Sequence, residues 1–259
     1  MSVNILAIGD VFGENGLDFL SKKLRAFKKL KNIAFTVVNG ENASVVGITP
    51  VQADAIFDAG ADVITLGNHT FSRQNIIPYL DDNRYILRPD NLSPLSSGTG
   101  HRVYDAPFGE VLVINLIGRV GMDLQSENPF FRADKLIKEN PARIVLVDMH
   151  AEATSEKAAL AWYLDGRVSA VWGTHTHVQT SDAAVLPHGT GFITDLGMTG
   201  PALSILGVKP EQSISRFLGE PRRQQYMPAS GARKMEGAIF EIDEKTGKCL
   251  SVEAVRITE

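Results

Sequence analysis

The chain has 259 residues, of which 44% are hydrophobic and 22% are charged, and its formal net charge at pH 7 is −4. This is ordinary globular composition, long enough for a large core. The negative charge argues against the broad positive field that non-specific nucleic-acid binding needs. The single cysteine, Cys249, excludes an internal disulfide and a thiolate metal site.

No apolar stretch approaches the roughly 18 residues that a membrane helix requires. The first residues, Met1 to Asn4, lead straight into a strand pattern, without the basic start and apolar core of a signal peptide. We therefore expect a cytoplasmic protein without membrane association.

Strand and helix patterns alternate in the first third of the chain. Strands are expected at residues 3–9, 33–38 and 62–66, and helices at about 15–30 and 50–58. Thr49-Pro50 is a typical helix start and Gly60 a typical stop. This alternation predicts parallel strands joined by helical crossovers.

The rest of the chain mixes this pattern with hairpins. Residues 91–100 predict a loop, and residues 101–117 predict a hairpin that turns at 108–110. Further elements are expected as helices at 132–139 and 154–164, strands at 143–148 and 168–172, hairpins within 183–195 and 236–258, and loops with one short helix over 197–233. With no linker or internal repeat, we predict one α/β domain over residues 1–259, in which two mixed β-sheets pack together with helices on the outside.

Five apolar runs of the kind that form buried strands stop at side chains able to hold a metal ion. They end at Asp10, at Asn39-Gly40-Glu41-Asn42, at Gly67-Asn68-His69, at Asp148-Met149-His150 and at Gly173-Thr174-His175-Thr176-His177. In open α/β sheets, ligands bind beyond the carboxyl ends of the strands. These side chains are therefore expected to converge.

The candidate ligands are all oxygen or imidazole donors: Asp10, Glu41, Asn42, Asn68, His150, His175 and His177. Such donors suit iron, manganese or zinc, and the set is too large for one tetrahedral ion. Two ions bridged by Glu41 fit better, and paired ions serve the in-line displacement of phosphoester hydrolysis. With only two obligatory carboxylates, such a pocket would be positive and would attract phosphate.

Neighbouring residues suggest supporting roles. His69 follows a proposed ligand and could donate a proton to the leaving alkoxide as a general acid. His175 and His177 would share a face of an extended segment, and Asp148 could hydrogen-bond a ligand from behind. Glu152 and Glu156 are expected as charges at a helix start.

Each motif also has an ordinary structural interpretation when it is taken alone. Asp10 could be a turn or helix-cap residue, and Asn-Gly-Glu-Asn is a good turn sequence. His101 and His188 fall in expected loops or hairpin edges and are interpreted as surface histidines. The combination of five strand ends favours the metal centre.

These residues resemble the calcineurin-like metallophosphoesterase superfamily, and specifically its YmdB-like branch. The resemblance covers nearly the whole chain, and the block from Asp148 to Lys157 is its most specific part. It rests on the segments Ile8–Gly13, Asn39–Ala43, Gly67–Thr70, Arg88–Asn91, Asp148–Lys157, Gly173–Val178 and Thr194–Met198. The wider superfamily usually has Asp-x-His on its first strand, where this chain has Phe12, and a bridging aspartate where it has Glu41-Asn42. Both departures are typical of the YmdB-like branch.

The resemblance implies a metallophosphoesterase-like sandwich and a defined set of roles. Asp10, Glu41, Asn42 and His177 would hold one ion, Glu41, Asn68, His150 and His175 would hold the other, and His69 would be the proton donor. It implies a phosphodiesterase for cyclic nucleotides, notably 2′,3′-cyclic AMP, acting by attack of a metal-bridging hydroxide. The two divalent or mixed-valence ions would be iron or manganese, with zinc as a further option.

Other functions remain open at this point. The same centre could serve a phosphomonoesterase or a nuclease, and a regulatory protein that binds a nucleotide or RNA with slow chemistry is a third reading. A positioned acid such as His69 favours catalysis over binding alone. Substrate-binding residues cannot be named from the sequence, and a homo-oligomer is implied only at the family level.

Overall fold

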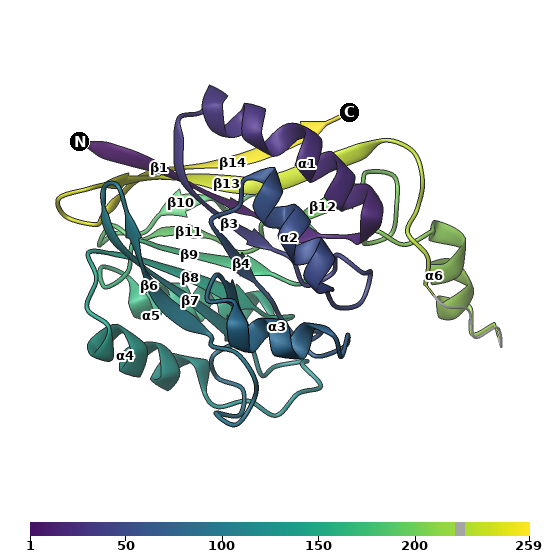
Figure 1. The fold of residues 1–259 in the computed structure, drawn as a ribbon, viewed down its shortest axis with the longest axis horizontal. Coiled ribbons are helices and arrows are strands. Elements are labelled where there is room, and N and C mark those ends of the chain that lie inside the picture. Colours follow the sequence, from purple (N-terminus) through teal and green to yellow (C-terminus); the bar gives the residue numbers. More distant parts are fainter. Residues whose placement is uncertain (221–225) are drawn as a thin grey trace.

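The computed structural model describes residues 1–220 and 226–259, and its fold is built on two β-sheets (Figure 1). The first sheet has the order β2-β12-β13-β1-β3-β4-β5, with β14 paired to β13. Its strands are β1 (Ser2–Ile8), β2 (Asp10–Val11), β3 (Ile33–Asn39), β4 (Val63–Thr65), β5 (Ile86–Leu87), β12 (Met198–Pro201), β13 (Arg233–Asp243) and β14 (Cys249–Thr258). Strands β1, β3, β4 and β5 are parallel, and β13 runs antiparallel to β1.

The second sheet has the order β10-β11-β9-β8-β7-β6. Its strands are β6 (His101–Ala106), β7 (Gly109–Ile117), β8 (Ile144–His150), β9 (Ala170–Thr174), β10 (Ala184–Val185) and β11 (Gly191–Ile193). Strands β7, β8, β9 and β11 are parallel, while the hairpin partners β6 and β10 are antiparallel to their neighbours. Both sheets are therefore mixed, as predicted.

Helices cover the outer face of each sheet, while α6 (Pro210–Phe217) stands apart at one end of the molecule (Figure 1). The first sheet packs against α1 (Gly13–Leu30), α2 (Pro50–Ala59) and α3 (Ile76–Asp82), and the second against α4 (Pro129–Glu139) and α5 (Thr154–Leu164). The result is a four-layer helix, sheet, sheet, helix arrangement.

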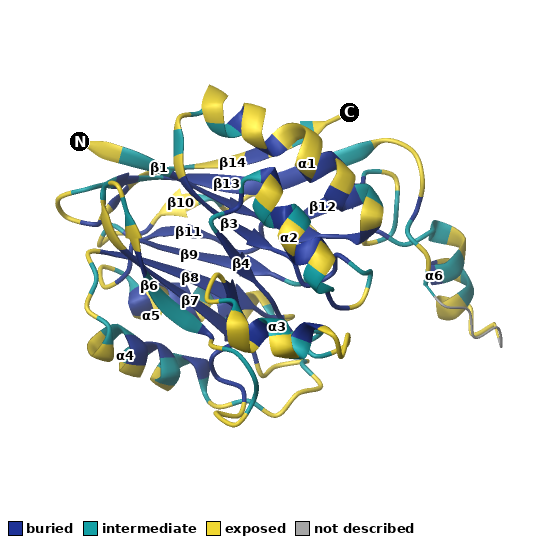
Figure 2. Cartoon of the chain, in the orientation of Figure 1, coloured by how far each residue is buried: buried dark blue, intermediate teal, exposed yellow. Residues whose placement is uncertain are grey.

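The alternation of side chains along β1 shows how the sequence builds these layers. Ile5 and Ala7 lie in the apolar layer between the two sheets, together with Trp172 of the second sheet, whereas Leu6 and Ile8 lie under the helices. Successive strand residues point to opposite faces, so a continuous apolar run marks a strand buried on both sides. The buried strands and the half-exposed helices are visible in Figure 2.

The predicted boundaries of α2 are confirmed in detail. Thr49 caps the helix by accepting a hydrogen bond from the Gln52 backbone, and the Gln52 side chain returns a contact to the Thr49 backbone. Gly60 ends the helix with a φ of 116°, a conformation that favours glycine.

Four short elements were not predicted: β2, β5, α3 and β12. Each has too few residues to establish a periodic pattern. Strand β12 also contains Gly200 and Pro201, residue types that are disfavoured in strands. It lies within the stretch expected as loops and one short helix, of which residues 221–225 fall outside the described residues. Helix α4 begins earlier than expected, because Asn128 caps it before Pro129.

The two sheets end on the same side at one point. Asn39, the last residue of β3, donates a hydrogen bond to Thr174 at the end of β9, over 3.3 Å, and the backbone of His175 donates to Asp10 in β2, over 3.1 Å. The carboxyl ends of β3 and β9 therefore meet across the sandwich. Among the described residues, none of the helices has the length and apolar character needed to span a membrane.

Candidate metal centre

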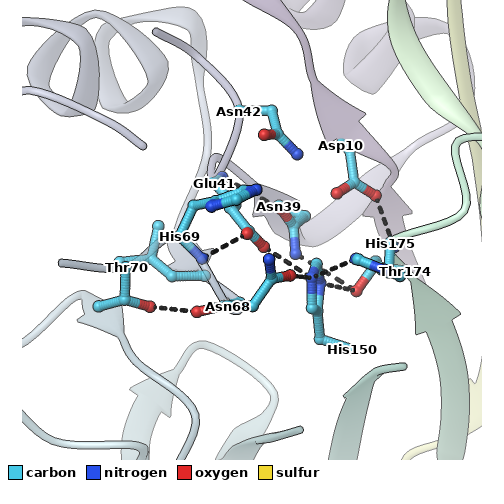
Figure 3. Close-up of polar contacts among 12 residues, drawn as sticks. Asp10, Asn39, Glu41, Asn42, Asn68, His69, Thr70, His150, Thr174 and His175 are labelled. Carbon is cyan, nitrogen blue, oxygen red and sulfur yellow. Dashed lines mark hydrogen bonds and ion pairs between the residues drawn. The ribbon is translucent and has the colours of Figure 1, made fainter. Parts of the chain in front are cut away.

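All seven predicted ligands lie around this meeting point of the two sheets. All of them except His177 are labelled in Figure 3. The first sheet supplies Asp10 from β2, Glu41 and Asn42 from the turn after β3, and Asn68 from the turn after β4. The second sheet supplies His150, the last residue of β8, and His175 and His177, which follow β9. One donor atom each of Asp10, Glu41 and His150 lies within 4.8 Å of the others.

Three acceptor atoms crowd around a single nitrogen of His150. Its Nε2 lies 2.7 Å from Glu41 Oε2, 2.9 Å from Asn68 Oδ1 and 3.1 Å from His175 Nδ1. A proton on Nε2 could serve only one of these atoms well, whereas a cation attracts all four lone pairs at once. The arrangement therefore fits a metal ion better than a hydrogen-bond network.

A second group of donors surrounds His177. Its Nε2 lies 3.6 Å from Asp10 Oδ1 and 3.2 Å from the Asn42 amide nitrogen, and its Nδ1 donates to the backbone carbonyl of Leu206 over 2.9 Å. Since Nδ1 carries the proton, Nε2 keeps its lone pair. A half-turn of the Asn42 amide would exchange its nitrogen for its oxygen and present a metal ligand at this point.

Each carboxylate of the centre has one oxygen that accepts from a backbone N–H and one that faces a histidine ring nitrogen. Asp10 Oδ2 accepts from the His175 backbone over 3.1 Å, and Glu41 Oε1 accepts from the His69 backbone over 2.7 Å. Asp10 Oδ1 and Glu41 Oε2 are buried, and their nearest partners are ring nitrogens, His177 Nε2 at 3.6 Å and His150 Nε2 at 2.7 Å. Buried polar atoms are normally satisfied, so these two oxygens fit coordination to cations.

The electrostatics of the protein residues alone are strongly perturbed. Burial would lower the pKa of His150, but the charges of Glu41, Asp10 and Asp148 outweigh it and raise the pKa to about 8. Burial, with His150 close by, lowers the pKa of His175 to about 4. Burial would raise the pKa of Asp10, but the nearby His177 and His150 rings lower it well below its usual value. The carboxylates thus favour positive charge at this position.

The expectation that His175 and His177 share a face of an extended segment is wrong. Both residues have positive φ angles, 101° and 63°, so the segment is a tight bend. Consequently His175 Nδ1 faces His150 while His177 Nε2 faces Asp10 and Asn42. The bend directs the two rings to different groups of donors, which a straight strand would not do.

The expectation that Asp148 hydrogen-bonds a proposed ligand is wrong as stated, because its carboxylate accepts from Thr65 and Thr174, and only Thr174 contacts His150. Thr174 donates to Asp148 Oδ1 over 2.8 Å, and its hydroxyl lies 3.0 Å from His150 Nδ1. Since the hydroxyl proton points to Asp148, Nδ1 of His150 is the donor and Nε2 is free to face the centre. Burial raises the pKa of Asp148 to about 6.

Two acidic residues near α5 hold neighbouring segments. Glu152, whose side chain is 58% exposed, lies before the helix and pairs with His175 Nε2 at 3.2 Å. Glu156 lies in the first turn of α5, as expected, and its carboxylate also accepts from the backbone of Arg119 and Val120. Glu152 was expected only as a charge at a helix start, and its pairing with His175 was not predicted because partners so distant in sequence leave no local signal.

Gly67 leaves the space in which the donors meet. A Cβ atom at this position would lie 1.9 Å from Glu41 Oε2 and 2.2 Å from His150 Nε2. No other residue type fits there without displacing both side chains. Such a glycine could have been suspected from its place before Asn68-His69, but only the tertiary structure shows what it accommodates.

His69 lies next to the centre, at its rim. With Asn68 and His175 it lines a cavity of about 380 Å³ that is open to solvent. Phe12, which stands where the wider superfamily has a histidine, packs edge-on against the His177 ring with 5.6 Å between ring centroids. The remaining histidines differ from each other: His188 is exposed, as expected, whereas His101 is half-buried and pairs with the buried Asp90 at 2.7 Å. The prediction of a surface role is therefore wrong for His101.

Two packed mixed sheets with outer helices, and a buried set of oxygen and imidazole donors where the sheets meet, define the architecture of the metallophosphoesterases. The chain belongs to the YmdB-like protein family, which it matches over residues 6–255. This confirms the resemblance stated from the sequence.

Relatives in this family extend over the whole chain. A Bacillus subtilis protein named 2′,3′-cyclic-nucleotide 2′-phosphodiesterase is 42% identical over 99% of this chain and 98% of its own length. A crystal structure described as a novel phosphatase from Mycoplasma pneumoniae has a TM-score of 0.93 at 32% identity, covering 100% of this chain and 94% of that one. A hypothetical protein from Thermus thermophilus has a TM-score of 0.92 at 36% identity, covering 99% of this chain and 100% of that one.

Proposed function

We propose that this protein is a metal-dependent phosphodiesterase that hydrolyses 2′,3′-cyclic nucleotides. The observation that carries the proposal is the cluster of three acceptors around His150 Nε2, one of which is the buried Glu41 Oε2, with the buried Asp10 Oδ1 nearby. The name of the Bacillus subtilis relative supports the substrate class, since that protein is 42% identical over nearly the whole chain.

Two cations are proposed, iron or manganese, with Glu41 shared between them. Asp10, Asn42 and His177 would complete the first ligand set, and Asn68, His150 and His175 the second. When bound, the cations would supply positive charge for the phosphate group and would acidify a water molecule for attack on phosphorus.

The protein residues contribute orientation and a proton. His69 is proposed as the general acid that protonates the ribose oxygen released when the cyclic diester opens. Its backbone N–H donates to Glu41, which fixes the segment that carries the ring, and its side chain lines the cavity next to Asn68 and His175. A substrate phosphate held by the donor set would therefore lie close to the His69 imidazole.

The test combines elemental analysis with turnover of a substrate panel. Wild-type protein purified without chelator should contain about two metal ions per chain and should hydrolyse 2′,3′-cyclic AMP. The His69→Ala variant should keep the metals, because the ring is not a proposed ligand. It should lose about 10²- to 10⁴-fold in kcat, the usual contribution of general acid catalysis.

His188→Ala is the matched control, since its side chain is 74% exposed and its ring pairs with Asp165, away from the proposed ligands. This variant should behave like the wild type. Equal rates in His69→Ala and wild type would remove His69 from the mechanism. A metal-free protein that cannot be reconstituted with iron or manganese would refute the proposal as a whole.

A further inference from the structure

Two hollows adjoin the metal centre and share Asn68 and Leu124 as part of their walls. The outer one, of about 380 Å³, is the cavity lined by His69 and His175, with residues 121–124 on its other side. The inner one has a volume of about 190 Å³. Its lining consists of Gly67, Asn68, Thr70, Phe71, Leu92, Ser93, Ser96, Leu124 and Gln125. Because they share Asn68, a proposed ligand, the two hollows are neighbours beside the donor set.

Leu124, which lines both hollows, belongs to a loop with fixed ends. The buried side chain of Asn91 accepts from the backbone of Ile117 over 2.8 Å and donates to the carbonyls of Ile117 and Glu127, over 2.8 and 2.9 Å. The Asn91 carbonyl also accepts from the Glu127 backbone over 2.8 Å. Glu156 holds the first part of the loop through the backbone of Arg119 and Val120. Leu124 therefore lies on a loop whose start and end both hydrogen-bond to the Asn91 side chain.

The chemistry of the two hollows differs. The outer one is lined by the imidazoles of His69 and His175, which suit a phosphate, and by the carboxyl group of Asp123, which could accept from sugar hydroxyls. The inner one combines apolar surfaces of Phe71, Leu92 and Leu124 with amide and hydroxyl groups along its edge. Apolar walls with a few polar groups suit a heterocycle that buries its faces and has a hydrogen-bonding edge.

We propose that the inner hollow binds the base of the nucleotide substrate, with Leu124 packing against it. The inference rests on the proposed function, because the position of the phosphate at the donor set is what directs the base into the inner hollow. Leu124 would then determine preference for nucleosides over simpler phosphodiesters, and it would take no part in the chemical step.

The test compares two leucine substitutions of the same kind in the metal-loaded protein. Leu124→Asp alters the proposed base site at a side chain that is 39% exposed, and Leu95→Asp is the control at a residue that is 96% exposed and lines neither hollow. The substrates are 2′,3′-cyclic AMP and ribose 2,3-cyclic phosphate, which has the same reacting group and no base.

The wild type should show a KM for 2′,3′-cyclic AMP at least about 10-fold below that for the base-free diester, as expected for a hydrophobic subsite. Leu124→Asp should raise the KM for 2′,3′-cyclic AMP by about 10-fold, and by clearly more than it raises the KM for the base-free diester. Leu95→Asp should match the wild type. Equal KM values for the two substrates in the wild type, or the same effect from both substitutions, would overturn the inference.

Calorimetric binding of adenosine 3′-monophosphate separates this inference from the proposed function. If the metal-loaded wild type hydrolyses neither diester, the proposed function fails. A Kd raised about 10-fold by Leu124→Asp and unchanged by Leu95→Asp would still support the base site. An unchanged Kd in both variants would refute the base site even if hydrolysis is observed.

Discussion

The tautomers of the three histidines in the centre are determined by the groups behind them. His150 Nδ1 donates to Thr174, His177 Nδ1 donates to the Leu206 carbonyl, and His175 Nε2 faces Glu152. In each ring the opposite nitrogen faces the donor set. Outer partners of this kind orient metal ligands and commonly change metal affinity by about 10- to 100-fold when they are removed.

Gly67 lacks a side chain, and this leaves the space that Glu41 and His150 occupy. Gly67→Ala should force Glu41 and His150 apart, because the new Cβ would lie 1.9 Å and 2.2 Å from their donor atoms. We expect the variant to fold with a loss of about 1–3 kcal/mol, typical of overpacking, and to retain less than half of the wild-type metal content. Elemental analysis after dialysis would measure this.

Gly200→Ala is the control for this substitution, because its Cβ would approach no atom closer than 3.2 Å. It should keep the wild-type metal content. Retention of both metals in Gly67→Ala would show that the donors tolerate displacement and would contradict the proposed ligand geometry.

At the level of elements, the bend that carries His175 and His177 is held by a buried ion pair. Asp195 Oδ2 lies 2.7 Å from Lys157 Nζ, and both side chains are fully buried. The same oxygen accepts from the Thr176 backbone and hydroxyl, over 3.2 and 2.8 Å. Helix α5 thus stabilises the unusual backbone of the bend through Lys157.

Lys157→Met should lower the free energy of unfolding by about 3–5 kcal/mol, because it leaves the Asp195 carboxylate buried without its counter-charge. Lys22→Met provides the comparison, since Lys22 also lies 2.7 Å from a carboxylate, that of Asp18, but both of those side chains are about half exposed. It should change stability by only about 0.5 kcal/mol. Urea denaturation would measure both, and similar losses would show that burial does not strengthen the pair.

At the level of the whole molecule, the proposed ligands join the two sheets. Asp10, Glu41 and Asn68 come from the first sheet, and His150 and His175 from the second. Cations bound between them would connect the sheets at the end where the strands meet, in addition to the apolar layer. A ligand that binds only the folded state stabilises a protein by mass action.

That residues 1–259 form one domain stays a prediction.

Addition of manganese at 100 times its Kd should therefore raise the free energy of unfolding by about 2.7 kcal/mol for each independent site. Chelation should reverse the effect. Glu41→Gln should abolish most of the gain, since Glu41 is proposed to be shared by both ions. Thermal unfolding with and without metal would measure it, and a Tm that does not respond to metal would argue against the centre.

Local pattern was sufficient for the long elements. Neighbouring residues alone predict the apolar runs of β1, β3, β8 and β9 and the hairpin of β6 and β7. They also predict the start of α2 at Thr49 and its end at Gly60. The polar residues at the strand ends indicated the donor set for the same reason, because the carboxyl ends of parallel strands share one edge of a sheet. The family resemblance added the assignment of the individual ligands to one ion or the other.

The sequence by itself determined which side chains could bind metal, because residue type and position after a strand are local properties. Only the tertiary structure decided how they face one another. The bend at His175–His177, the support of His150 by Thr174, the space at Gly67 and the pairing of Lys157 with Asp195 all depend on contacts between residues distant in the chain. Such contacts are set by the packing of one sheet on the other, which leaves no trace in a short segment.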